Sequence, residues 1–158
     1  MNCAVCEDIV LIERGEDPHA VARLRTGYVR LLPCQHYPGG TVFVAKRCVP
    51  ELHELARDER DAFLAEMADV AASVFDAFKP RKLNYELLGN GCPHLHWWLV
   101  PRYEDDPHPR GPIWENLDFL RSLWTDGARA TADERDRRRA LLFEALGARD
   151  VVVEAGYL

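Results

Sequence analysis

The segment that most constrains the fold is residues 94–101, which read HLHWWLVP and combine two histidines with an apolar, aromatic run. The turn-forming residues 90–93 precede it, and a proline-rich loop follows. This pattern predicts a buried β-strand that is entered from a tight turn. Because side chains alternate along a strand, we expect His94, His96 and Trp98 on one face. Each imidazole has two ring nitrogens that need partners, so the shared face predicts adjoining roles in one site.

The composition is that of one soluble globular domain. The chain has 158 residues, of which 47% are apolar and 29% are charged, which is sufficient for a hydrophobic core. The net charge of −6 argues against general nucleic-acid binding. We expect no membrane span, because no apolar run approaches about 20 residues, and no secretion signal. Five cysteines in such a chain predict free thiols or thiolates in a reducing compartment, the cytoplasm.

Two periodicities predict an α+β fold. Runs of β-branched and aromatic residues between turn residues predict successive antiparallel strands. These strands cover residues 9–13, 20–25, 28–32, 41–45, 83–88 and the run from 94. Between them, residues 58–78 repeat apolar side chains every three or four positions and carry charges on the other face. This segment is therefore expected to be a long amphipathic helix that covers the sheet and stops at Pro80.

The last third of the chain has a different character. Residues 117–124 predict a short helix, and Thr131 with Glu134 has the form of a capping box that opens a helix ending at Gly147. We therefore divide the chain into a main unit, 1–112, and a helical C-terminal extension, 113–158, that packs on the same domain.

Cys3 and Cys6 form a C-x-x-C pair that can chelate one metal ion. The same spacing serves redox motifs, but these follow a strand, and too few residues precede Cys3 to form one. A zinc site needs two further ligands, and spacing alone does not choose among the candidates Cys34, His36, Cys48, His53, Cys92 and His94.

Taken together, these features resemble the histidine triad (HIT) family of nucleotide hydrolases and transferases. The family motif, His-φ-His-φ-His-φ-φ with φ apolar, is often followed by Pro-Arg, and residues 94–102 read HLHWWLVPR. The order of elements is also similar: the C-x-x-C pair, a strand ending in Lys46-Arg47, a helix, a strand with Asn84, a Gly/Asn turn and the motif. The resemblance covers about residues 1–110. It implies a HIT-like fold with a mainly antiparallel sheet of about five strands, and a homodimer.

The resemblance implies a role for each motif position. His96 takes the place of the nucleophile, which forms a nucleotidyl-imidazole, while its other ring nitrogen donates to a backbone carbonyl. Asn84, the turn Gly89-Asn90-Gly91 and Trp98 are expected to bind the nucleotide and its phosphates. The zinc-bearing members imply a closed, structural zinc site whose ligands are Cys3, Cys6, Cys48 and His94, with His53 as the runner-up.

Trp98 departs from the motif, because it stands where the third histidine belongs and cannot accept a proton. Leaving-group assistance then comes from elsewhere, or the leaving group is good, or activity is weakened. The leading function is hydrolysis of a nucleoside phosphate derivative, such as a dinucleoside polyphosphate, at the α-phosphorus. The alternatives are a nucleotidyltransferase or phosphorylase, which the variation of transferases at this position favours slightly, and a non-catalytic nucleotide-binding module.

Overall fold

The computed structural model describes residues 3–123, 125, 129–149 and 151–158. In chain order, its elements are α1 (Ala4–Glu13), β1 (Ala20–Arg23), β2 (Gly27–Leu31), β3 (Thr41–Ala45), the 3₁₀ turn η1 (Leu52–Glu54), α2 (Arg57–Phe78), β4 (Lys82–Glu86), β5 (His96–Arg102), the 3₁₀ turn η2 (Ile113–Glu115), α3 (Leu117–Ser122), α4 (Ala132–Ala148) and β6 (Ala155–Gly156).

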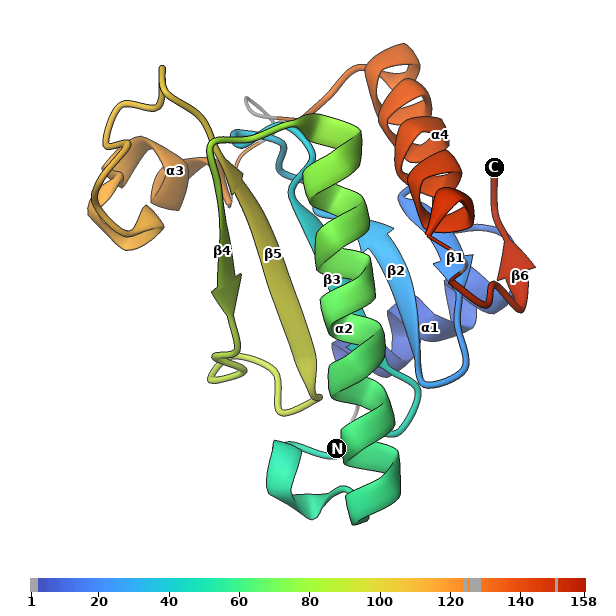
Figure 1. Cartoon of the computed structure of the whole chain (residues 1–158). Helices are drawn as coiled ribbons and strands as arrows, with labels where there is room; N and C mark the ends of the chain where they lie inside the picture. The colour runs from blue at the N-terminus through green and yellow to red at the C-terminus, as the bar shows by residue number, and fades with distance from the viewer. Residues whose placement is uncertain (1–2, 124, 126–128, 150) are drawn as a thin grey trace.

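All strand pairs are antiparallel, and the strand order in the sheet is β4-β5-β3-β2-β1-β6 (Figure 1). The predicted α+β fold with a mainly antiparallel sheet is confirmed. The sixth strand comes from the C-terminal end of the chain, where β6 pairs with β1. The motif strand β5 lies inside the sheet, between β3 and β4, and pairs with both.

Helices α2 and α4 cover one face of the sheet (Figure 1). The amphipathic pattern places Phe63 of α2 on Phe43 of β3, with stacked rings whose centroids lie 4.9 Å apart. Helix α4 begins with the predicted capping box, in which Thr131 and Glu134 bind each other's backbone N–H groups, and it packs on α2 and β1. The C-terminal extension therefore contributes to the same hydrophobic core as the sheet.

The other face of the sheet carries α1, and here one prediction is wrong. Residues 9–13 are helical rather than extended. Val5, Ile9 and Ile12 recur every three or four positions, and this stripe packs on the sheet residues Tyr28, Val42 and Val44. A five-residue apolar run cannot distinguish a strand from the end of a helix, and tertiary packing decides between them.

Two predicted boundaries also need correction. Strand β5 begins at His96, so His94 lies in the bend before the strand, and β4 ends at Glu86 rather than at residue 88. The short helix α3 ends at Ser122, and Trp124 lies outside the described residues. Among the described helices, none combines the length and apolar character needed to cross a membrane.

Candidate functional site

Three segments that are distant in sequence bring the four predicted metal ligands together. Cys3 and Cys6 lie about one turn apart because Cys3 is the N-cap residue of α1. Cys48 follows β3, and His94 precedes β5. One ligand atom from each residue lies within 4.8 Å of all the others. The cluster thus joins the N-terminus to the entry of the motif strand.

The geometry of this cluster fits a tetrahedral zinc ion. Zinc–ligand lengths of about 2.3 Å to sulfur and 2.0–2.1 Å to nitrogen imply ligand–ligand distances of roughly 3.5–3.8 Å. His94 Nδ1 lies 3.5 Å from Cys3 Sγ and 3.5 Å from Cys6 Sγ. The other ring nitrogen of His94 donates to the carbonyl oxygen of Ala45 at 2.8 Å, which leaves the Nδ1 lone pair for a metal. His94 is 1% exposed, so its position is fixed by packing.

The remaining ligand candidates lie apart from this group or at its border. Cys34 Sγ contacts the hydroxyl of Ser122, and the ring of His36 contacts Asn116. His53 is exposed in η1. Cys92 is a neighbour, with its Sγ 3.8 Å from that of Cys3, but it does not belong to the set in which all ligand atoms lie within 4.8 Å.

Two thiols in the cluster, those of Cys3 and Cys6, have strongly perturbed pKa values. Burial by itself raises the pKa of Cys3, but hydrogen bonds from the Cys6 backbone and from neighbouring side chains, including His94, lower it to about 6. Burial raises the pKa of Cys6 to about 12, and the neighbouring Cys48 and Cys3 thiols add to this rise. One thiolate therefore forms easily while further ones repel it, an arrangement that a divalent cation stabilises.

His96 faces a cavity of about 430 Å³ next to the cluster. The cavity is lined by Glu86, Leu88, Gly89, Asn90, Gly91, Cys92, His96, Trp98, Trp114 and Leu123. His96 Nδ1 donates to the carbonyl oxygen of His94 at 2.6 Å, so its Nε2 carries the lone pair. The indoles of Trp98 and Trp114 are stacked with centroids 6.2 Å apart, which makes one wall of the cavity apolar.

The turn at 89–91 supplies another wall of this cavity. Gly89 has φ of +70°, a left-handed conformation that glycine adopts without steric cost. The structure thus places four predicted nucleotide-binding residues, Gly89, Asn90, Gly91 and Trp98, around the same cavity as His96. Backbone N–H groups and the Asn90 amide in such a turn are suitable donors to phosphate oxygens.

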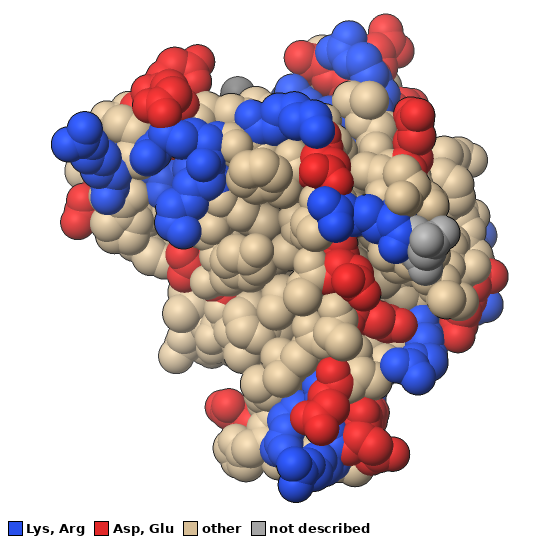
Figure 2. All heavy atoms as spheres, in the orientation of Figure 1, with Lys and Arg blue, Asp and Glu red and all other residues tan. Residues whose placement is uncertain are grey.

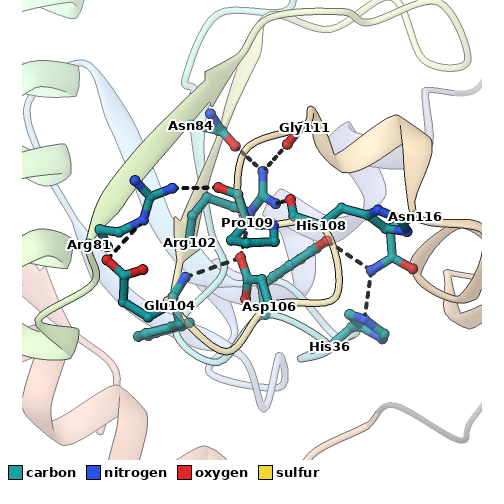
Figure 3. A network of polar contacts seen from close by, with 12 residues as sticks. His36, Arg81, Asn84, Arg102, Glu104, Asp106, His108, Pro109, Gly111 and Asn116 are labelled. Atoms are coloured by element: carbon teal, nitrogen blue, oxygen red, sulfur yellow. Dashed lines mark hydrogen bonds and ion pairs between the residues drawn. The ribbon is translucent and has the colours of Figure 1, made fainter.

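The fifth predicted nucleotide-binding residue, Asn84, lies elsewhere. Its Oδ1 accepts a hydrogen bond of 2.8 Å from Nη1 of the buried Arg102. Arg102 lies at the centre of the network in Figure 3. Asn84 lines a different hollow and does not belong to the lining of the His96 cavity. Arg102 is 18 positions from Asn84 along the chain, and no local sequence pattern predicts a contact over that separation.

Sequence reasoning missed five residues that line the His96 cavity: Glu86, Leu88, Cys92, Trp114 and Leu123. Trp114 and Leu123 come from the C-terminal extension, which the motif does not cover, and Trp114 Nε1 donates to Glu86 Oε2 at 3.4 Å. Glu86 pairs with Trp98 across the β4–β5 ladder. Strand alternation from Asn84 could have indicated Glu86. No comparable signal marked Trp114, because its contact depends on how the extension folds back.

Comparison with known proteins gives matches among solved structures. No protein-family model matches the chain, and no curated protein matches it. A histidine triad protein from Sinorhizobium meliloti is 26% identical, with a TM-score of 0.68 over 85% of this chain and 94% of that one. A histidine triad protein from Marinobacter aquaeolei is 24% identical, with a TM-score of 0.69 over 82% and 89%. A zinc-bound histidine triad family protein from Mycobacterium smegmatis is 18% identical, with a TM-score of 0.64 over 95% and 96%.

Proposed function

We propose that this chain, a histidine triad protein by its fold and motif, hydrolyses a nucleoside phosphate derivative at the α-phosphorus through a covalent intermediate on His96. One observation carries the proposal: the hydrogen bond from His96 Nδ1 to the His94 carbonyl oxygen. It fixes the tautomer in which Nε2 is unprotonated, and His96 lines a cavity large enough for part of a nucleotide.

The reaction then has two displacements. His96 Nε2 forms a bond to the α-phosphorus, and the leaving group departs with the electron pair of the broken P–O or P–N bond. Water next attacks the same phosphorus, the P–N bond to His96 breaks, and the nucleoside monophosphate is released. Donors in the 89–91 turn stabilise the charge on the phosphate oxygens, which is the main demand of phosphoryl transfer.

Trp98 determines which substrates suit this site. Its indole has one N–H donor and cannot carry the proton that a poor leaving group needs. The site therefore favours substrates whose leaving group is stable as an anion, such as the phosphate chain of a dinucleoside polyphosphate. A nucleotidyltransferase or phosphorylase, in which an acceptor other than water takes the nucleotide, uses the same first step. A nucleotide-binding module uses the cavity without either step.

We further propose a structural zinc ion held by Cys3, Cys6, Cys48 and His94. The ligand separations support it, and three cysteines with one histidine form a closed site without an open position for substrate. When bound, zinc supplies charge neutralisation for the thiolates and a crosslink between α1 and β5. His94 then positions His96 through its backbone carbonyl.

A homodimer and a cytoplasmic location complete the proposal. The edge of β4 is unpaired within the described chain, and Tyr85 on this strand is 50% exposed, with Phe75 of α2 42% exposed. Exposed apolar side chains beside an open strand edge are typical of a protein interface. None of the five cysteines, all of which the structure describes, forms a disulfide, which fits a reducing compartment.

The decisive experiment is the replacement His96→Ala, with His53→Ala as the matched control, because His53 lies in η1 away from the cavity. We expect His96→Ala to abolish turnover across dinucleoside polyphosphates, nucleotide sugars and nucleoside phosphoramidates, while fold and nucleotide binding persist. Acid-quenched wild-type protein should carry a nucleotidyl mass that the variant lacks. Wild-type turnover by the His96→Ala protein would overturn the mechanism.

The products separate the alternative functions. Free nucleoside monophosphate identifies a hydrolase, and a nucleotidylated acceptor identifies a transferase. Binding without any product for all three substrate classes identifies a binding module. Size-exclusion chromatography with light scattering tests the dimer, which Tyr85→Lys should weaken if the β4 edge forms the interface.

A further inference from the structure

A second hollow, separate from the His96 cavity, is lined by cationic side chains. Its volume is about 440 Å³. It is lined by Arg81, Lys82, Asn84, Arg102, Pro109, Arg110, Gly111 and Pro112, a set that contains four cations and no carboxylate. Figure 2 shows Lys and Arg side chains gathered at the end of the molecule where β4 begins. This concentration of positive charge stands out in a chain with a net charge of −6.

Buried Arg102 holds the walls of this hollow in place. Its guanidinium donates to the carbonyl oxygens of Gly111 at 2.8 Å and His108 at 2.6 Å, and to Asn84 Oδ1 at 2.8 Å (Figure 3). Its Nε forms an ion pair of 2.8 Å with Asp106. Arg102 is thus neutralised and fully engaged, so it is a positioning residue. It fixes the loop that carries Arg110 against the start of β4 before any ligand arrives.

The other cations retain charge that the chain itself does not neutralise. Within the described residues, no carboxylate forms an ion pair with Lys82 or Arg110, and both are exposed. Arg81 pairs with Glu104 at 3.3 Å, but Glu104 is 81% exposed, so solvent screens this pair. Asn84 has its oxygen fixed by Arg102, and its amide nitrogen points away from Arg102 as an available donor (Figure 3).

We propose that this hollow binds a phosphoanion, with Lys82, Arg110 and Arg81 as the cationic ligands and the Asn84 amide as a further donor. Two guanidinium groups and one ammonium around a concave surface match the several oxygens and the multiple charge of a phosphate chain. A single carboxylate carries too little charge to need three cations. The hollow is also too small, and the chain too acidic, for a nucleic-acid backbone.

The place of the hollow relates it to the His96 cavity. Lys82, Asn84 and Glu86 alternate on one face of β4, and Glu86 lines the His96 cavity. Glu86 lies four residue steps along the strand from Lys82, a distance of roughly 13 Å. The phosphoanion is therefore either a distal phosphate of a leaving group whose reaction takes place at His96 or a free polyphosphate. The first source rests on the proposed function, and the second does not.

The test is calorimetric titration of the full-length protein with inorganic tripolyphosphate. The double variant Lys82→Gln/Arg110→Gln should bind about tenfold or more weakly than wild type, because two charge-assisted contacts are lost. The control Arg57→Gln/Arg121→Gln removes the same net charge from exposed arginines outside the hollow and should bind within about twofold of wild type. No binding by wild type, or equal loss in both double variants, overturns the proposal.

A second measurement identifies the source of the phosphate. Competitive inhibition of turnover by tripolyphosphate, lost in Lys82→Gln/Arg110→Gln, assigns the hollow to the distal phosphates of the leaving group. Tripolyphosphate binding without competition assigns it to a free polyphosphate. If the chain shows no turnover, the titration still tests whether the hollow binds a phosphoanion. If tripolyphosphate does not bind, the proposed mechanism at His96 is unaffected.

Discussion

The imidazole of His96 donates a 2.6 Å hydrogen bond to the backbone carbonyl of His94, whose own ring belongs to the metal cluster. The proposed nucleophile and the proposed zinc ligand are thus joined by one hydrogen bond and two residues of backbone. A change at the metal cluster that moves the His94 backbone also changes the orientation of His96. This relationship predicts that catalysis depends on the metal content, whereas the metal content does not depend on catalysis.

The first prediction concerns metal removal. Chelation, or Cys6→Ala, should lower the thermal midpoint clearly, because structural zinc binding contributes on the order of 10 kcal/mol in small domains. The activity should fall with it, since His96 loses its fixed partner. Elemental analysis of protein purified without chelator should give about one zinc per chain, and calorimetry should follow the stability. Protein without zinc, or with unchanged stability after chelation, contradicts this prediction.

The second prediction separates the two candidate thiols next to Cys3. Cys48 belongs to the compact ligand set, whereas Cys92 lies 3.8 Å from Cys3 Sγ at its border. Loss of a residue that only hydrogen-bonds to a metal ligand weakens metal binding by up to roughly 100-fold. Cys48→Ala removes a ligand and should therefore weaken zinc binding by more than this, whereas Cys92→Ala should change zinc binding little. Competition with a colorimetric chelator measures both. The reverse order of effects would assign the fourth ligand to Cys92.

The third prediction concerns Trp98, where the motif has no third histidine. If leaving-group protonation limits turnover, Trp98→His should raise kcat for poor leaving groups by up to about 10²–10⁴-fold and change good ones little. Trp98 also stacks on Trp114, so Trp98→Phe controls for lost packing. Equal effects of Trp98→His on substrates with good and poor leaving groups count against this role.

Sequence alone could predict those features that local patterns determine. The long helix α2 follows from its period. The family resemblance implied a backbone carbonyl as the partner of His96, and the structure identifies it as the carbonyl of His94. The four metal ligands came from the family resemblance, since spacing left six candidates. Helix α1 was missed at residues 9–13 because five apolar residues do not reveal whether a helix or a strand contains them.

Long-range packing accounts for the rest. Asn84 was expected at the nucleotide, but Arg102 holds its side chain in another hollow. Trp114 was not predicted because the extension reaches the His96 cavity only after it folds back beside β4. Local periodicity contains no information on such contacts, whereas a solved relative or a co-varying pair of positions would provide it.

The fourth prediction is a dependence of stability on pH at His19. Burial lowers the pKa of His19 to about 4, and the charges of Arg30, Arg135 and Arg129 add to this, while Asp17 opposes it. In the unfolded chain the pKa is about 6.5, so between pH 6.5 and 4 the unfolded state binds the additional proton. The free energy of unfolding should therefore fall as pH falls through this range. His19→Gln should reduce that slope in urea titrations at pH 7 and 4.5, and an unchanged slope would assign it to other groups.

The fifth prediction concerns the buried ion pair of Arg102 and Asp106. Arg102 is 2% exposed, and its removal takes the charged partner from the Asp106 carboxylate and the donor from three oxygen acceptors. The Tyr103 backbone N–H remains as a neutral donor to Asp106. Arg102→Met should therefore destabilise the fold by about 3–5 kcal/mol. The double variant Arg102→Met/Asp106→Leu should be less destabilised than the sum of the single changes, because it leaves no unpaired buried charge.

Urea denaturation of the four proteins in this cycle measures the coupling between the two side chains. Arg102→Lys adds a geometric test, because an ammonium keeps the charge but cannot reach Asn84, Gly111 and His108 at once as the planar guanidinium does. It should retain part of the stability and lose tripolyphosphate affinity, since the loop bearing Arg110 is no longer held against β4. Additive single changes in the cycle would show that Asp106 does not depend on Arg102, and the buried pair would then have no part in fixing this loop.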